Sequence, residues 1–472
     1  MSEETNDKEL EAAAEAETAD AEITAEPERA SHGKKISLST FIFSAIALVL
    51  AAVMTTYACC GAFYKKRLAE AKLDSIAQGA SYEGYEALAL IEALFKTYAY
   101  YDDLDDDKIA EYVLKAYVAA TGDVHARYFT EEEFEEMMSS SMGEGEGIGI
   151  NVIYSEISYD GELMGVIEVI SVAPDSPAED AGVMVGDLIM WVDADGEQTV
   201  DSVGYNAAVA SLKGEAGTKA EFSVLRLTDG VYEKKSFSVE RQKVTYRSVT
   251  SKVSETDASV GVVKITSFDT VTPTQFSEEM DALIADGCEK FVFDVRYNPG
   301  GDLNSIRAIL SYFLEEGDVI LSAVDKSGAR EEITAKPVSY DSERYEPCNV
   351  ARADIGKYRG YELAVICNGS TASAAELFTS ALRDYELAEI IGETTYGKGS
   401  MQSTISLDQF GYSGALKITT KLYYPPCGEG YDGEGIAPDI EVTLSEEAKK
   451  YSIYKLPESL DNQLIAAIEA LK

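Results

Sequence analysis

The chain has 472 residues, and its 84 acidic against 40 basic side chains give a formal net charge of −44 at pH 7. A charge of this size repels polyanions, which excludes nucleic acid as an expected partner and argues against adhesion to anionic lipid surfaces. An apolar fraction of 46% is ample for folded cores, and the length corresponds to about two to four domains.

Residues 1–35 are rich in Ala and Glu and poor in large apolar groups, which predicts a disordered acidic tail. Residues 36–64 contain no charged side chain, and about 20 apolar residues are enough to cross a membrane as a helix. We expect one retained transmembrane helix here, with a cleaved signal peptide as the alternative. Flanking basic residues do not decide its orientation. Because a short tail precedes the span and most of the chain follows it, we expect a cytoplasmic tail and an extracytoplasmic body at a bacterial plasma membrane.

Residues 65–144 carry apolar side chains at three- and four-residue steps, which predicts a helical region. Between residues 145 and 230 the pattern changes to short β-branched runs separated by turns, which indicates a small β-rich domain. Gly147, Ile148, Gly149 and Ile150 open its first expected strand.

Residues 231–445 alternate between strand and helix patterns, which predicts an α/β core with a mixed, largely parallel sheet covered by helices. The expected strands are 261–265, 290–295, 363–367 and 388–391, and the expected helices are 274–286, 303–314 and 374–385. Residues 446–472 are expected to form a carboxy-terminal helical extension.

Only two histidines occur in the chain, His32 and His125, so a serine hydroxyl has few candidates for the usual histidine base. A lysine that burial keeps neutral can take that role. Ser373 lies where an expected strand passes into an expected helix, so the helix dipole and the next amide, on Ala374, favour it as a nucleophile with an oxyanion donor.

Lys398 lies between Gly397 and Gly399, which leave room for its side chain to approach a serine as the base. Gln402 follows four residues later and is expected to hydrogen-bond the amine or fix its rotamer. Gly300 and Gly301 end a second strand-to-helix turn, where bare backbone can approach a substrate and donate an N–H. This chemistry needs no metal and no cofactor.

Other readings of these residues stay open. Ser370 is the rival nucleophile, and the start of the helix favours Ser373. We interpret His125 as structural and Asp294 as a turn-stabilising carboxylate. Four cysteines in the core region lack metal-ligand spacing and fit either disulfides or free thiols: Cys288, Cys348, Cys367 and Cys427.

Residues 145–230 resemble a PDZ domain, through the Gly147–Ile150 run, the Ser176-Pro177-Ala178-Glu179 element and the Gly186-Asp187-Leu188-Ile189 element. The resemblance implies that the Gly147–Ile150 loop receives the carboxylate of a peptide and that the adjoining strand pairs with it.

Residues 122–442 resemble the carboxy-terminal processing proteases, also called tail-specific proteases. The motifs that carry the resemblance are Thr371–Glu376, Tyr396–Gly399, Asn298–Gly301, Tyr423–Pro425 and Gly435–Asp439. Ala375 stands where the family usually has a second serine. The resemblance implies a Ser373–Lys398 dyad with Gln402 as its support. It also implies that the substrates are proteins with free carboxy-terminal tails, and that the PDZ domain receives the tail and gates activity. It also implies a homo-oligomer through the terminal helices.

Two other functions remain as alternatives. One is a PDZ adaptor that docks the tails of envelope proteins without cutting them, which the intact Ser373, Lys398 and Gln402 argue against. The other is an acyl hydrolase that acts on esters.

Overall fold

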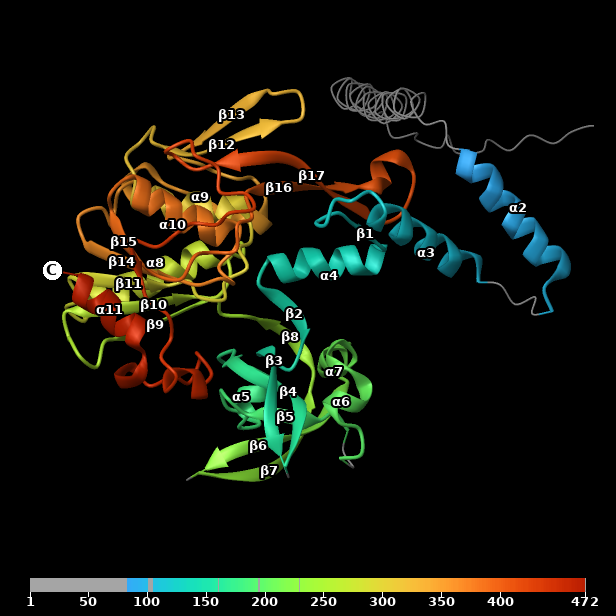
Figure 1. Cartoon of the computed structure of the whole chain (residues 1–472), viewed down its shortest axis with the longest axis horizontal. Helices are drawn as coiled ribbons and strands as arrows, with labels where there is room; N and C mark the ends of the chain where they lie inside the picture. Colours follow the sequence, from blue (N-terminus) through green and yellow to red (C-terminus); the bar gives the residue numbers. More distant parts are fainter. Residues whose placement is uncertain (1–82, 101–104, 160, 194–195, 229, 472) are drawn as a thin grey trace, which may run out of the picture. The chain divides into compact units, whose positions relative to one another are not determined.

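The computed structural model describes residues 83–100, 105–159, 161–193, 196–228 and 230–471 (Figure 1). The predicted acidic tail and the predicted transmembrane helix at 36–64 lie outside these residues. Within them, no helix is both long and apolar enough to span a bilayer. The chain divides into the units Met1–Glu83 and Gly84–Lys472, and the second holds all the elements below, apart from the first residue of α2.

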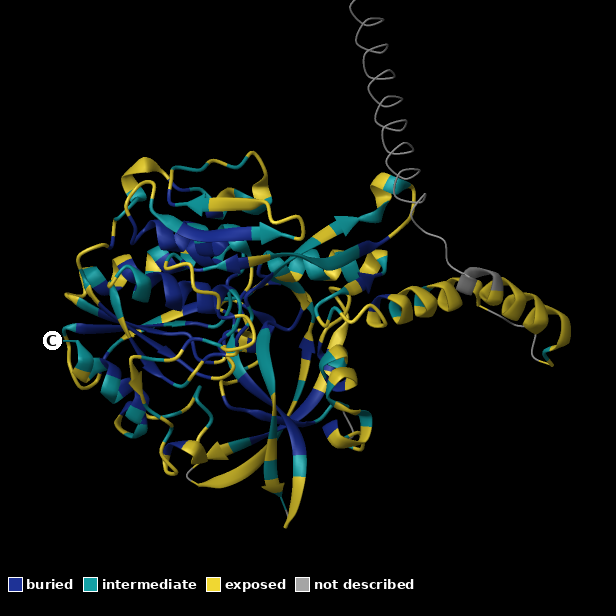
Figure 2. Cartoon of the chain, turned by 45° about the horizontal axis from the view of Figure 1, so that its top comes forward, coloured by how far each residue is buried: buried dark blue, intermediate teal, exposed yellow. Residues whose placement is uncertain are grey.

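Three helices follow one another at the start of the described chain: α2 (Glu83–Tyr98), α3 (Asp106–Ala119) and α4 (Glu131–Ser141). The α4 helix begins at a capping box in which Thr130 and Glu133 bond to each other's backbone N–H. The α2 and α3 helices are exposed along most of their length (Figure 2). The short strand β1 (Arg127–Phe129) lies between α3 and α4 in the sequence and pairs with β17 of the core.

A five-stranded antiparallel sheet forms the β-rich module. Its strands, in spatial order, are β3 (Ile150–Tyr159), β4 (Glu162–Val172), β5 (Leu188–Trp191), β6 (Lys219–Thr228) and β7 (Val231–Glu240). The helices of the module are α5 (Pro177–Asp180), α6 (Val200–Val203) and α7 (Tyr205–Leu212). Among the described strands β3 pairs only with β4, so one of its edges is open. Gly147 ends β2 (Glu144–Gly147), which pairs with β8 (Gln242–Thr245). Ile150 begins β3. The Gly147–Ile150 run, which was expected to open a strand, therefore connects β2 to β3.

The main sheet of the core has six strands. Their spatial order is β18 (Ile440–Glu441), β15 (Ala388–Gly392), β14 (Glu362–Cys367), β11 (Lys290–Asp294), β10 (Val260–Ile265) and β9 (Val249–Val253). All neighbours are parallel except β9, which runs antiparallel to β10. The four strands predicted for the core are all present in this sheet, and the expectation of a largely parallel arrangement holds for it.

Helices cover both faces of the main sheet. The helices α8 (Thr272–Ala285), α9 (Leu303–Ser311) and α10 (Ala374–Asp384) bury Phe276, Ile309 and Phe378 in one cluster with Phe293 of the sheet. On the other face, α11 (Asn462–Ala470) buries Leu464 and Ala467 against residues of β10, β11, β14 and β15. The expected carboxy-terminal extension is therefore built into the core, because its apolar stripe closes the second face of the sheet.

A second core sheet is antiparallel and was not predicted. It contains β1, β17 (Ala415–Tyr424), β12 (Val319–Asp325) and β13 (Arg330–Thr334) in that order, with β16 (Ser400–Ser406) also paired to β17. The core is thus mixed as a whole. Short 3₁₀ turns complete the chain at Glu343–Cys348, Arg352–Asp354, Leu407–Phe410, Ala448–Lys450 and Glu458–Leu460. The four cysteines of the described residues are free thiols, and only Cys427 is exposed.

Candidate active site

Ser373 lies at the junction between β14 and α10, in a conformation that few non-glycine residues adopt. It comes directly before the first residue of α10, and its backbone angles are φ 57° and ψ −118°. Such a conformation costs about 1–3 kcal/mol, so the surrounding contacts must hold it. Ser370 is exposed on the preceding turn and does not line the pocket that Ser373 lines.

The turn that follows β11 packs directly against Ser373. A Cβ atom on Gly300 would lie 2.7 Å from Ser373 Cβ and 2.8 Å from the Ala374 nitrogen, so only glycine fits at this position. The N–H of Gly300 donates to the side chain of Asn298 at 2.9 Å, so it is engaged within its own turn rather than free for an oxyanion. The Ala372 N–H donates to the Asn298 carbonyl at 2.9 Å, which ties this turn to the serine turn.

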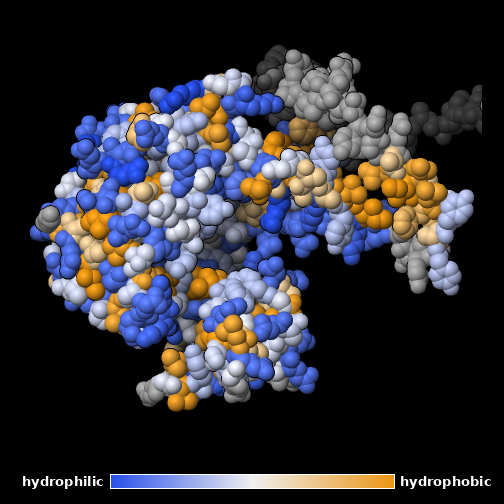
Figure 3. Space-filling model, viewed as in Figure 1, coloured by the Kyte–Doolittle hydropathy of each residue, from blue (hydrophilic) through white to orange (hydrophobic). Residues whose placement is uncertain are grey.

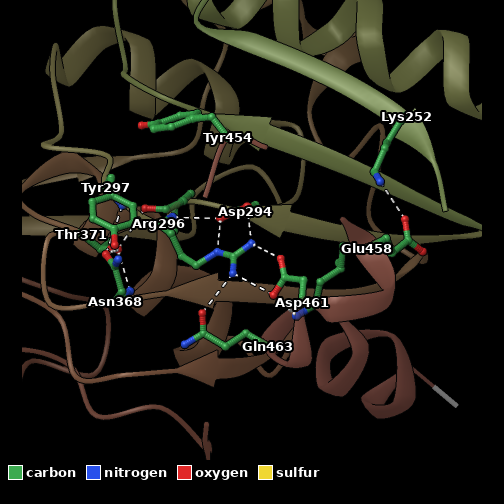
Figure 4. Close-up of polar contacts among 12 residues, drawn as sticks. Lys252, Asp294, Arg296, Tyr297, Asn368, Thr371, Tyr454, Glu458, Asp461 and Gln463 are labelled. Atoms are coloured by element: carbon green, nitrogen blue, oxygen red, sulfur yellow. Dashed lines mark hydrogen bonds and ion pairs between the residues drawn. The ribbon is translucent and has the colours of Figure 1, made fainter. Parts of the chain in front are cut away.

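A buried ion cluster supports the end of β11 (Figure 4). The Arg296 guanidinium donates twice to Asp294, at 2.9 and 2.8 Å, and twice to Asp461 at the start of α11, at 3.0 and 2.8 Å. Burial alone would raise the pKa of Asp294, but the Arg296 charge outweighs it and keeps that pKa below its ordinary value. Asp294 is thus a structural carboxylate, as its position at a strand end suggested, and α11 is connected to the turn beside Ser373.

The serine turn also bonds to this strand end. The Tyr297 N–H donates to the Asn368 side chain at 3.1 Å, and the Thr371 hydroxyl donates to the Val295 carbonyl at 2.9 Å (Figure 4). Tyr297 has a φ of 63°, so both turns carry a non-glycine residue with positive φ. These bonds fix the two turns relative to each other.

Glu376 joins the serine turn to the lysine loop. This residue is completely buried in the first turn of α10. One carboxylate oxygen accepts the N–H groups of Ser373 and Lys398, each at 2.8 Å. The other accepts the Gly397 N–H and the Thr395 hydroxyl, each at 2.6 Å. A single side chain therefore sets the backbone of both residues expected to react.

Lys398 lies half-buried on a loop whose glycines are required by close packing. A Cβ on Gly397 would lie 2.8 Å from the Gly435 nitrogen, and a Cβ on Gly399 would lie 2.9 Å from Asp432 Cβ. Burial lowers the pKa of the Lys398 amine below its ordinary value of 10.5, and the charge of Lys417 lowers it further, whereas the Glu376 carboxylate acts in the opposite direction. The free amine, which is the basic form, is thereby favoured.

One pocket of about 410 Å³ brings six of the expected residues together. They are Ser373, Ala374, Lys398, Gln402, Gly300 and Gly301. The expected peptide-binding residues Gly147, Ile148, Gly149 and Ile150 instead line a separate groove of about 960 Å³ beside α7 and β3. Ser267 and Asp269 line both, so the groove adjoins the pocket.

Gln402 is bonded differently from the expectation. Its amide nitrogen donates to the Ser400 hydroxyl at 3.0 Å and to the Thr419 hydroxyl at 3.2 Å, and no hydrogen bond to the Lys398 amine occurs within the described residues. Thr419 in turn donates to Asp123 through its hydroxyl at 3.0 Å and its N–H at 2.8 Å. Gln402 is thus part of a chain of bonds that ends in the turn before β1.

Four side chains near the pocket were assigned no role from the sequence: Glu376, Asp123, Asp269 and Lys417. Glu376 ends the Thr371–Glu376 motif, and serine followed three residues later by glutamate is also a capping-box pattern. Burial raises the pKa of Asp269 to about 6, although the bond from the Ser267 hydroxyl opposes this. His125 lies in a turn within the region expected to be helical, and burial and then the Lys398 charge lower its pKa.

Comparisons with known proteins match this chain to one family of proteases. The model of peptidase family S41 matches residues 259–442. A carboxy-terminal-processing protease of Bartonella bacilliformis is 31% identical over 358 residues, which cover 74% of this chain and 73% of that protein. The carboxy-terminal processing protease CtpA of Bacillus subtilis is 29% identical over 353 residues, which cover 74% of this chain and 67% of that protein. A Bacteroides fragilis structure described as an S41 protease shares the fold, with a TM-score of 0.53 and 17% identity over 81% of this chain and 96% of that one.

Proposed function

The chain belongs to the carboxy-terminal processing proteases of peptidase family S41, and from this premise we propose that it is a serine endopeptidase that cuts proteins near their carboxy termini. The observation that carries the proposal is the shared pocket. Ser373 and Lys398 both line it, and Glu376 holds the backbone N–H of each. The lowered pKa of Lys398 supports its role as the base.

In the proposed reaction, the Lys398 amine takes the proton of the Ser373 hydroxyl while Oγ bonds to the scissile carbonyl carbon. The carbonyl oxygen becomes an oxyanion that the N–H groups of Ala374 and Gly301 stabilise. The C–N bond then breaks, and the Lys398 ammonium gives its proton to the leaving amine. A water molecule next transfers a proton to Lys398 and attacks the acyl ester, which releases the new carboxy terminus and restores Ser373.

We assign substrate delivery to residues 145–230 as a PDZ domain. The open edge of β3 supports pairing with an extended peptide, and the groove lined by Gly147–Ile150 supports capture of the peptide's terminal carboxylate. Because Ser267 and Asp269 belong to both the groove and the pocket, a tail bound in the groove leads toward Ser373. Occupancy of the groove by a tail would then gate cleavage.

We also propose that residues 36–64 anchor the enzyme in a bacterial plasma membrane, with the protease outside the cytoplasm. The uncharged sequence of this span supports the anchor. Recovery of the full chain with membranes after an alkaline wash, at its unprocessed mass, is the expected result. A soluble chain that begins near residue 59 would instead indicate a cleaved signal peptide.

Self-association is proposed through the helices that precede the module. Exposed apolar residues gather on α2 and α3, including Leu90, Ile91, Phe95, Ile109 and Leu114 (Figure 3). The apolar residues of α11, in contrast, are used within the core. Sedimentation of the full chain in detergent, compared with a variant carrying Leu90→Glu and Phe95→Glu, tests this assignment, and unchanged assembly would contradict it.

The central test compares Ser373→Ala and Lys398→Ala with Ser370→Ala on an unstructured protein with an apolar tail. We expect the first two variants to lose on the order of 10³-fold or more in kcat/KM while keeping the unfolding midpoint, and Ser370→Ala to retain cleavage. Wild-type turnover in either of the first two would refute the dyad. Tail binding by the wild-type chain with no cutting would favour the adaptor, and ester hydrolysis without peptide cleavage would favour an acyl hydrolase.

A further inference from the structure

A second lysine, Lys417, faces the same pocket as Lys398. It lies on β17, where its register partners are Thr404 of β16 and Arg127 of β1. Lys398 comes two residues before β16, the strand paired with β17. Lys417 and Lys398 line the pocket together with Ser373. Two adjacent segments thus each contribute a lysine to the lining of one small cavity.

No carboxylate within the described residues forms an ion pair with either lysine at 4.0 Å or less. The acidic groups near them are bonded to other donors. Glu376 accepts four such bonds, Asp123 bonds to Thr419 and the His125 N–H, Asp269 to Ser267, and Asp432 to the Gly399 N–H. Arg127 on β1 adds a positive charge beside Lys417, and the Tyr423 hydroxyl donates to the Lys398 carbonyl. Although the chain has a net charge of −44, Lys398 and Lys417 thus line this pocket without an ion pair to a carboxylate of the described residues.

The two lysines are not equivalent in this surrounding. Burial and then the Lys417 charge lower the pKa of Lys398, whereas burial and then the Arg127 charge lower the pKa of Lys417. The Lys417 charge therefore acts on Lys398 against its charged form, while the Glu376 carboxylate acts in the opposite direction.

We propose that Lys417 is a positioning residue of the active site, whose ammonium charge keeps the neighbouring Lys398 as a free amine, so that the base of the dyad works as a two-lysine unit. This inference rests on the proposed function of Ser373 and Lys398. In a partly buried site, the positive charge of Lys417 disfavours a second positive charge on Lys398. Without the Lys417 charge, Lys398 would keep its proton to a higher pH.

The test measures kcat/KM against pH for the full chain with Lys417→Met, Lys417→Arg and Lys421→Met. The acid limb is the part of the profile in which kcat/KM rises with pH. In Lys417→Met this limb should move to higher pH by about one unit, so kcat/KM should be about tenfold lower near neutrality and should reach the wild-type value at alkaline pH. Lys417→Arg keeps the charge and should keep the limb at its wild-type pH. Lys421→Met removes a charge from the same strand outside the pocket and should not move the limb.

A loss of rate at every pH, or a higher KM with an unmoved limb, would overturn the inference, because a merely structural or substrate-binding lysine acts in those ways. If Lys417→Met fails to fold, the limb is read from Lys417→Gln and, independently, from the pH dependence of acylation of the Lys398 amine measured by mass spectrometry. Lys398→Ala, assayed in parallel, separates the two claims. If it is inactive while the limb of Lys417→Met stays in place, only the role of Lys417 fails, and if it is active, the dyad itself fails.

Discussion

Replacing Glu376 with glutamine perturbs a buried side chain that bonds to the backbone of both Ser373 and Lys398. Each of its two oxygens accepts two hydrogen bonds, one pair from Ser373 and Lys398 and the other from Gly397 and Thr395. In glutamine one oxygen becomes an NH₂ group. If the NH₂ group faces Ser373 and Lys398, both of their N–H groups face another donor. If it faces Gly397 and Thr395, the Thr395 hydroxyl can rotate and accept from it, so the Gly397 N–H alone loses its acceptor.

Each buried donor without an acceptor costs about 1–3 kcal/mol, and the less costly orientation leaves one, so Glu376→Gln should lower the free energy of unfolding by about 1–3 kcal/mol. Cleavage should also fall, because the N–H of Gly397, next to Lys398, loses its acceptor, and a misplacement of about 1 Å costs about a hundredfold in rate.

The assay is denaturant unfolding followed by circular dichroism, with kcat/KM measured on the same preparation. Glu389→Gln is the matched control, since Glu389 is exposed on β15 and should change stability by less than about 0.5 kcal/mol. If Glu376→Gln unfolded at the midpoint of Glu389→Gln and cut at the wild-type rate, the carboxylate would not be the element that aligns the site.

Three further changes follow from the same geometry. Gly300→Ala should abolish cleavage, because its Cβ would lie 2.7 Å from that of Ser373, and undiminished activity would contradict the packing. Arg296→Met should cost about 3–5 kcal/mol in unfolding free energy, since it leaves two carboxylates buried and unpaired, whereas the exposed control Arg352→Met should cost less than about 1 kcal/mol. Asp269 has a folded pKa of about 6, above its ordinary 3.8, so its contribution to stability is present at low pH and is lost as the pH rises through 6. Asp269→Asn should therefore raise the free energy of unfolding at about pH 7.5, by up to about 3 kcal/mol, with a higher Tm, and should leave both unchanged near pH 4. An equal effect at both pH values would contradict the raised pKa of Asp269.

The sequence was most informative where burial leaves a continuous apolar pattern. The parallel strands β11 and β14 are buried on both faces, so their runs of Val, Ile and Phe are unmistakable, and the helices α9 and α10 show apolar stripes. The antiparallel strands β16 and β17 lack such runs, because most of their residues are only partly buried and many are Ser, Thr or Lys. Nothing local indicates that these residues form a strand beside the pocket.

The site shows the same division. Ser373, Lys398 and the glycines around them could be predicted, since their chemistry depends on neighbours in the sequence. The contact between Thr419 and Asp123 joins residues that are far apart in the chain, and the approach of Lys417 to Lys398 depends on the pairing of β16 with β17. Such relations arise from tertiary packing, which no single segment encodes. The engagement of the Gly300 N–H by Asn298 likewise depends on the exact shape of one turn.

The most direct measurement is the intact mass of the purified chain after incubation with a fluorophosphonate, which reacts with activated serines. An uncharged Lys398 beside Ser373 predicts a single adduct, mapped to Ser373, that forms faster as the pH rises and does not form in folded Lys398→Ala. An adduct on another residue, or labelling of Lys398→Ala at the wild-type rate, would contradict the claim that this amine activates that hydroxyl.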